Sequence, residues 1–147
     1  MAGMLVPKRK SYVCSFGVLL DTSGSMSNDD MALGISQLTN LDDRGEGYVV
    51  CFESEAHWDK MVKLRKVNRE ELQKIKPHGG GGTRVAPLFK NYEKHMGKVD
   101  FLIILSDGQF DPVDIVAMEA PPCPVYWVIT SNYNFNPPFG KVFSLRD

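Results

Sequence analysis

The feature that most restricts the fold is a short apolar run that ends abruptly in a polar loop. Val18, Leu19 and Leu20 form the run, and the polarity changes at Asp21 within one residue. A continuous apolar run of this kind is typical of a strand that is buried on both faces of a sheet. The loop therefore begins at the carboxyl end of a buried strand, where open α/β sheets bind their ligands.

The loop carries side-chain oxygen atoms at regular intervals. Asp21, Ser23 and Ser25 are spaced two residues apart, and Gly24 allows the backbone to turn tightly. In an extended turn, side chains with this spacing point the same way. Oxygen ligands with few carboxylates suit magnesium or manganese better than zinc, which prefers Cys and His. For this loop alone, an Asx turn and a helix N-cap are the alternatives.

A second buried strand is predicted to end in the same way. The most apolar run of the chain, residues 101–105, is followed by Ser106, Asp107 and Gly108, which places a second aspartate at the carboxyl end of a strand. Between the two strands lies a run of four glycines that ends in Thr83. This run lacks the lysine of a phosphate-binding loop, and its glycines indicate a backbone that approaches something closely.

The rest of the chain alternates buried strands with amphipathic helices, which predicts an α/β fold with a mostly parallel sheet and helices on both faces. Residues 57–67 are expected to form an antiparallel edge strand, because the connection before them is too short for a crossover. Gly45 and Gly47 are expected to form a turn. The other strands are expected at residues 11–20, 48–52, 99–105 and 124–130, with a strand or turn at 141–145, and the helices at 28–41, 68–75, 85–95 and 111–118.

Length and composition indicate one ordinary globular domain. The chain has 147 residues and a net charge of −1, which gives no electrostatic reason to expect nucleic acid or an anionic membrane as a partner. Residues 1–10 are predicted to be a flexible basic arm, followed by one domain over residues 11–147. Cys14, Cys51 and Cys123 are odd in number and widely spaced, which favours reduced thiols and a cytoplasmic location over a disulfide.

Taken together, the three loops resemble the metal-ion-dependent adhesion site of von Willebrand factor type A (vWA) domains. That site combines a D-x-S-x-S motif, a lone Thr and an Asp in a T-D-G or S-D-G turn, in the order found here. The resemblance covers the chain from residue 11 and implies a three-layer, Rossmann-like fold. It also implies that Ser23, Ser25 and Thr83 bind Mg2+ or Mn2+ through their hydroxyls, while Asp21 and Asp107 act mostly through bound water.

A narrower resemblance is to the vWA-like domain at the carboxyl end of bacterial predicted metallopeptidases. The glycine run at residues 79–83, the turn at 105–108 and the segment 137–140 are similar to that subgroup. The sequence has no H-E-x-x-H motif and no peptidase-like region ahead of the domain. A peptidase activity is therefore not inferred from this resemblance.

The expected function is a protein-interaction domain whose partner offers an Asp or Glu to the metal, because neutral hydroxyl ligands leave the ion electrophilic. A MoxR-type AAA+ ATPase is one partner that the resemblance implies. Phe110, Tyr133 and Phe135 are predicted to form an exposed aromatic rim that contacts the partner. The alternative is that these rings pack their loop onto the sheet.

Two other functions stay open, a metal-dependent hydrolase and an accessory subunit of a metallopeptidase or AAA+ system. A hydrolase needs a base or nucleophile beside the metal. Of the three histidines only His78 adjoins a site loop, and no His–Asp pair is positioned by the sequence to activate Ser23 or Ser25. No catalytic residues are therefore predicted.

Overall fold

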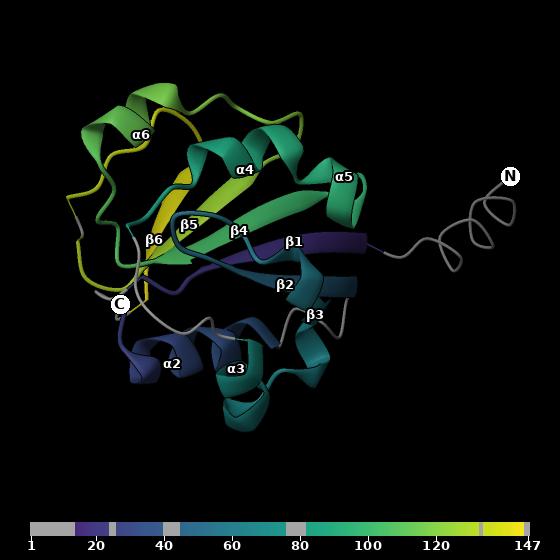
Figure 1. Cartoon of the computed structure of the whole chain (residues 1–147). Helices are drawn as coiled ribbons and strands as arrows, with labels where there is room; N and C mark the ends of the chain where they lie inside the picture. Colours follow the sequence, from purple (N-terminus) through teal and green to yellow (C-terminus); the bar gives the residue numbers. More distant parts are fainter. Residues whose placement is uncertain (1–13, 24–25, 40–44, 76–81, 133, 146–147) are drawn as a thin grey trace, which may run out of the picture.

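A computed structural model shows an α/β domain built on one six-stranded sheet (Figure 1). It describes residues 14–23, 26–39, 45–75, 82–132 and 134–145. The strands are β1 (Cys14–Asp21), β2 (Gly45–Phe52), β3 (Val62–Lys63), β4 (Phe101–Ser106), β5 (Val125–Ile129) and β6 (Lys141–Ser144). They lie in the order β3-β2-β1-β4-β5-β6, and every pair is parallel except β2 with β3. The predicted fold class is confirmed.

Helices cover both faces of the sheet, which gives the three predicted layers (Figure 1). Helices α2 and α3 lie on one face, and α4, α5 and α6 lie on the other. Their bounds are α2 (Asn28–Leu38), α3 (Arg69–Ile75), α4 (Ala86–Asn91), α5 (Glu93–Met96) and α6 (Pro112–Ala117), with 3-10 turns η2 (Trp58–Lys60) and η3 (Leu64–Lys66) beside β3.

Two apolar layers hold the helices to the sheet. Successive residues of a strand point to opposite faces, so Leu19 joins the layer under α4 and α6, while Val18 and Leu20 join the layer over α2. All three are fully buried. Strand β1 therefore has no solvent-facing side, as its continuous apolar run predicted. Its pairing with β4, in which Val18 lies beside Ile103, is also confirmed.

The expected turn at Gly45 and Gly47 is wrong, because both glycines belong to β2 and pair with β1. A Cβ atom on Gly47 would lie 2.5 Å from the Phe16 ring, and one on Gly45 would lie 2.3 Å from the Cys14 carbonyl oxygen. Real Cβ contacts are not that short. These glycines allow close packing against β1 rather than a change of chain direction.

The edge strand predicted at residues 57–67 has the right place and direction but the wrong length. Only β3 pairs, in antiparallel fashion, with Tyr48 and Val49 of β2. The apolar residues Trp58, Met61 and Leu64 recur every three positions, the period of a 3-10 helix, and η2 and η3 flank β3. The segment therefore alternates between 3-10 turns and a two-residue strand.

The helix termini differ from the sequence prediction by a few residues. Helix α2 ends at Leu38, and its N-cap is Ser27, whose side chain accepts a hydrogen bond from the Asp30 amide. The helix expected at 85–95 is divided into α4 and α5 around Tyr92. Among the helices that the structure describes, none is long and apolar enough to cross a membrane.

Candidate metal centre

Asp21 is the last residue of β1 and is fully buried. One of its oxygens, Oδ1, accepts a hydrogen bond from the Ser23 amide at 2.9 Å. The other, Oδ2, accepts one from the Ser106 hydroxyl at 2.6 Å. Because Ser106 ends the neighbouring strand β4, this contact ties the first predicted ligand loop to the third.

Two buried carboxylates lie close enough to influence each other. Burial raises the pKa of Asp21, and the charge of Asp107 acts in the same direction, while hydrogen bonds from Ser106 and Ser23 oppose the shift. Asp107 is 2% exposed, and its Oδ1 accepts a hydrogen bond from the Gln109 amide at 3.0 Å. Its Oδ2 is buried without a hydrogen-bond partner among the described residues.

This arrangement fits a divalent cation. A buried oxygen that lacks a donor is unfavourable unless a cation or water satisfies it, and a second carboxylate nearby adds repulsion that a cation would relieve. Across the described ranges, no three side chains of His, Cys, Asp or Glu gather closely enough to hold a metal. The predicted ligand set is not a cluster of that kind, because it combines only two carboxylates with hydroxyl oxygens. Both kinds of oxygen are ligands that Mg2+ accepts.

Hydrogen bonds from the segment after β5 stabilise the turn that carries Asp107. Asn132 donates its amide hydrogen to the Asp107 carbonyl at 2.9 Å and its side-chain Nδ2 hydrogen to the Gly108 carbonyl at 3.0 Å. Gly108 has a φ of +82°, a conformation that favours glycine. The S-D-G turn is therefore held from two sides, by Asn132 and by the contact of Ser106 with Asp21.

The structure also brings the second predicted loop to this edge of the sheet. Thr83 and Gly108 line one open hollow, together with Gln109, Asn134 and Asn136. The backbone after Thr83 is fixed, because the Arg84 amide donates to the carbonyl of Glu53, the residue after β2, at 2.7 Å. Ser25 lies outside the described residues.

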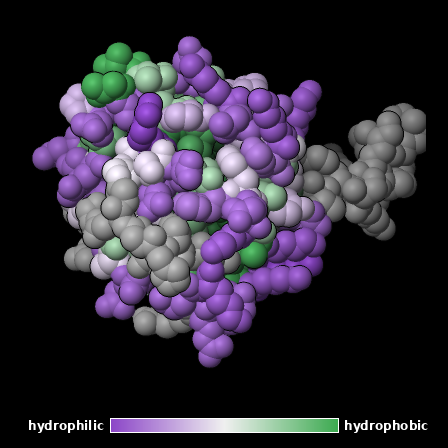
Figure 2. Space-filling view, viewed as in Figure 1, coloured by the Kyte–Doolittle hydropathy of each residue, from purple (hydrophilic) through white to green (hydrophobic). Residues whose placement is uncertain are grey.

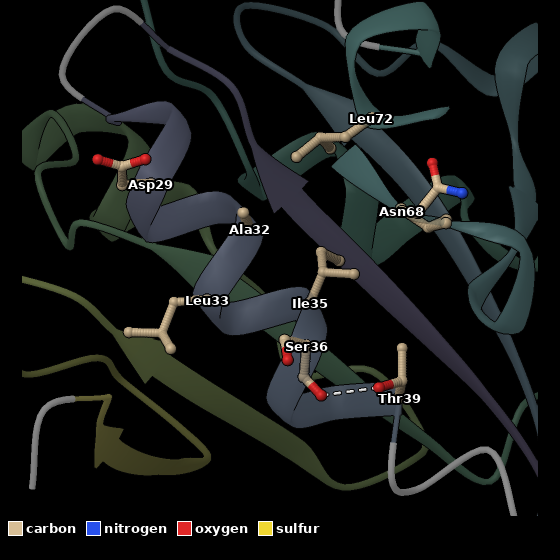
Figure 3. Close-up of a pocket in the computed structure, with 9 residues that line it drawn as sticks. Asp29, Ala32, Leu33, Ile35, Ser36, Thr39, Asn68 and Leu72 are labelled. Atoms are coloured by element: carbon tan, nitrogen blue, oxygen red, sulfur yellow. Dashed lines mark hydrogen bonds between the residues drawn. The ribbon is translucent and has the colours of Figure 1, made fainter. Parts of the chain in front are cut away.

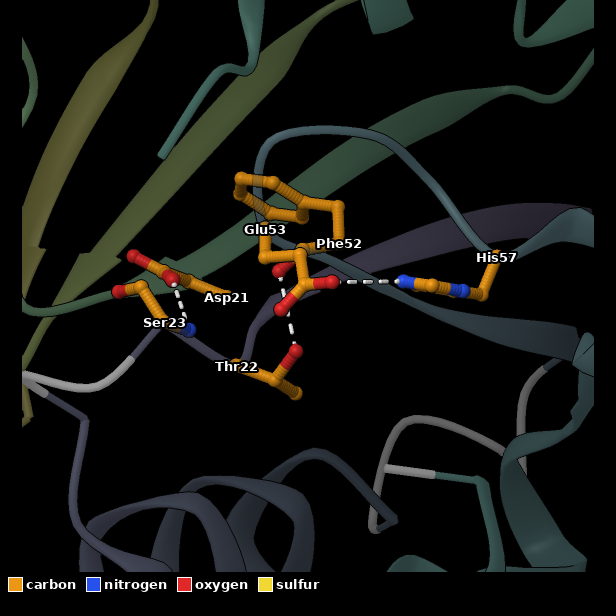
Figure 4. A network of polar contacts seen from close by, with 6 residues as sticks. All are labelled: Asp21, Thr22, Ser23, Phe52, Glu53 and His57. Carbon is orange, nitrogen blue, oxygen red and sulfur yellow. Dashed lines mark hydrogen bonds and ion pairs between the residues drawn. The ribbon is translucent and has the colours of Figure 1, made fainter. Parts of the chain in front are cut away.

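A further acid–base pair stands beside the first loop (Figure 4). The Glu53 carboxylate and the His57 imidazole are 3.3 Å apart and partly buried. The loop is held to the same strand end, because Thr22 donates its amide and hydroxyl hydrogens to the Phe52 carbonyl at 2.9 and 3.1 Å. The sequence interpretation did not single out Glu53, since nothing in its local sequence distinguishes it from a solvated glutamate.

The exposure expected of the aromatic rim is wrong for Phe110 and Phe135. They are 9% and 7% exposed, and their ring centroids lie 5.3 Å apart. Both rings also pack against the fully buried Trp127, at 5.8 and 5.1 Å. They hold the loop onto the sheet, which is the alternative that the sequence left open. Tyr133 lies outside the described residues.

The sequence interpretation missed the contacts of two buried polar residues. Ser106 was noted only as part of its turn, although it is the donor to Asp21. Asp114 in α6 is 3% exposed and accepts hydrogen bonds from the amides of Val85 and Ala86. No local sequence signal marks this contact, because its partners lie 28 and 29 residues away along the chain.

A separate hollow lies away from these loops, on the face covered by α2 and α3 (Figure 3). It is lined by apolar residues such as Ala32, Ile35 and Leu72, together with the polar residues Asp29 and Ser36. None of the predicted metal ligands that the structure describes lines it. It is therefore not part of the candidate centre.

Comparisons with known proteins agree with the fold. The family model described as "VWA-like domain (DUF2201)" matches residues 16–146. Among solved structures, the chain is similar to an aerotolerance-related membrane protein from Bacteroides fragilis NCTC 9343, crystallised with multiple mutations to serines. The TM-score is 0.54 at 13% sequence identity, over 79% of this chain and 67% of that one. No curated protein sequence matches.

Proposed function

Because the chain belongs to the family of VWA-like domains (DUF2201), we propose that it is a divalent-metal-dependent protein-interaction domain. Family membership supports a role in protein interaction at a general level. The ion would be Mg2+ or Mn2+, and its ligands would be Asp21, Ser23, Ser25, Thr83 and Asp107. When bound, the ion would supply a coordination position that a carboxylate of the partner could occupy.

The observation that carries this proposal is the buried, unpartnered Oδ2 of Asp107, close to the buried carboxylate of Asp21. Two carboxylates in such surroundings raise the free energy of the metal-free protein. Thr83 lines the hollow beside the same turn. Partner recognition at this edge would depend on the cation, because without it the carboxylates of Asp21 and Asp107 would repel an acidic side chain of the partner.

Isothermal titration calorimetry tests the metal. The wild type is expected to bind Mg2+ and Mn2+ weakly, and Asp21→Ala is expected to abolish binding because it removes the central carboxylate. Asp59→Ala is the matched control, since Asp59 is exposed and lies outside the site. Equal binding in Asp21→Ala, or no binding to the wild type at about 10 mM cation, a concentration that fills a weak extracellular-type site, would contradict the proposal.

A pull-down from the native host, with and without chelator, tests the partner. The expected partner presents an Asp or Glu, and a MoxR-type AAA+ ATPase is a specific candidate in the cytoplasm. Thr83→Ala removes one hydroxyl ligand and should lose the partner while keeping the fold. A partner that is recovered equally well by Thr83→Ala in chelator would place the interface elsewhere.

The second candidate function is a metal-dependent hydrolase, and the Glu53–His57 pair is the observation that favours it. An imidazole oriented by a carboxylate is a common general base. The two functions respond differently to His57→Ala. A hydrolase would lose turnover of its substrate, whereas an interaction domain would keep both its Mn2+ affinity and its partner.

A further inference from the structure

Helix α4 begins without a cap of its own. Its N-cap residue is Val85, which has no side chain able to accept a hydrogen bond. The missing acceptor comes from another helix. Asp114 of α6 accepts the Val85 amide hydrogen with Oδ2 at 2.9 Å and the Ala86 amide hydrogen with Oδ1 at 3.1 Å.

This contact is built into the interior of the protein. Asp114 is 3% exposed, although it belongs to a short surface helix. Both carboxylate oxygens are used, each by one buried backbone donor. Hydrogen bonds from amides to a carboxylate are stronger than those to a neutral acceptor, and buried amides left without a partner are strongly unfavourable. The pair of bonds therefore fixes Val85 and Ala86 relative to α6.

The fixed amides directly follow the predicted metal ligand Thr83. Arg84 donates its amide hydrogen to the Glu53 carbonyl at 2.7 Å, so three successive amides after Thr83 are each held by an acceptor from another element. These hydrogen bonds hold the backbone that directly follows Thr83.

We propose that Asp114 is a positioning residue for the metal centre, which holds Thr83 in place through the start of α4. This inference rests on the proposed function, because it concerns the affinity of the same ion. Groups that orient a metal ligand without touching the metal typically change its affinity by about 10- to 100-fold when removed. A cap that serves stability alone would leave the affinity of the folded protein unchanged.

The test compares Mn2+ affinity, measured by calorimetry, in Asp114→Ala and Asp114→Asn at a temperature where circular dichroism shows both to be folded. Asp114→Ala is expected to bind Mn2+ about 10-fold more weakly or worse. Asp114→Asn is expected to fall between it and the wild type, because its amide oxygen accepts one of the two hydrogen bonds.

Two controls separate positioning from charge and from stability. Glu119→Gln removes one negative charge just after α6, where Glu119 is exposed and lies 3.6 Å from Lys90. Met118→Ala truncates a buried side chain of the same apolar layer and leaves the Asp114 bonds intact. Both should keep the wild-type Mn2+ affinity, although Met118→Ala lowers the melting temperature.

Hydrogen exchange of the metal-free protein gives a readout that is independent of the ion. Peptides containing Val85 and Ala86 should exchange faster in Asp114→Ala than in Met118→Ala. Wild-type affinity in a folded Asp114→Ala would overturn the inference and leave the metal site standing. Absence of Mn2+ binding to the wild type would overturn the proposed metal site, and the inference with it.

Discussion

Replacing Phe135 by alanine distinguishes a packing residue from a residue that contacts a partner. The ring is 7% exposed and lies against Trp127 and Phe110. Truncating a buried Phe to Ala destabilises a protein by about 3–5 kcal/mol. In a domain of this size, 1 kcal/mol corresponds to a change in melting temperature of about 2–4 °C. We therefore expect Phe135→Ala to melt about 10 °C below the wild type.

Thermal unfolding followed by circular dichroism measures this shift, and Phe143→Ala is the matched control. Phe143 is the same residue type but is 48% exposed on the edge strand β6. Its truncation is expected to change the melting temperature by only a few degrees, because little packing is lost. If Phe135→Ala melted as high as Phe143→Ala and yet lost the partner, the packing interpretation would be refuted.

Two further predictions concern the carboxylate network. Because the folded-state pKa of Asp21 is raised, its contribution to stability in the metal-free protein is fully present below its unfolded pKa and is lost as the pH rises through the folded value. Asp21→Asn should therefore flatten the fall in unfolding free energy that sets in as the pH rises above the ordinary range of a carboxyl group, measured with urea at several pH values, and an unchanged slope would contradict this. Ser106→Ala removes the donor to Asp21 and the acceptor of the Gly108 amide hydrogen, and should destabilise the protein by about 2 kcal/mol. Exposed Ser36→Ala is the control, and equal urea midpoints for the two variants would argue against the network.

The strands that carry the predicted ligands could be read from the sequence for a simple physical reason. Each is buried on both faces, so its apolar run is continuous and its end is marked by an aspartate. Parallel pairing then places the ends of neighbouring strands at one edge of the sheet, which brings Asp21 near Asp107. The contact between Asp21 and Ser106 follows from that register, because Ser106 ends the strand next to β1.

The elements that were predicted wrongly depend on information that local patterns do not contain. The apolar residues Trp58, Met61 and Leu64 are three positions apart, which is the spacing of a 3-10 helix. An interpretation based on the two-residue alternation of a strand misses this spacing. Gly45 was assigned to a turn because glycine is common in turns, although here its missing side chain allows close strand packing. Whether Phe135 faces solvent or Trp127 is decided by tertiary packing alone.

Helix α6 has exposed apolar side chains on one side and a buried carboxylate on the other. Val113 and Val116 are 77% and 86% exposed and form an apolar patch at the surface (Figure 2), while Asp114 between them points inward to the start of α4. The helix is a single short rigid unit, so a molecule bound to the valines cannot displace it without also displacing Asp114 and its two amides. Such a molecule could therefore change the affinity of the protein for the ion. By thermodynamic linkage, the ion would then change the affinity for that molecule by the same factor.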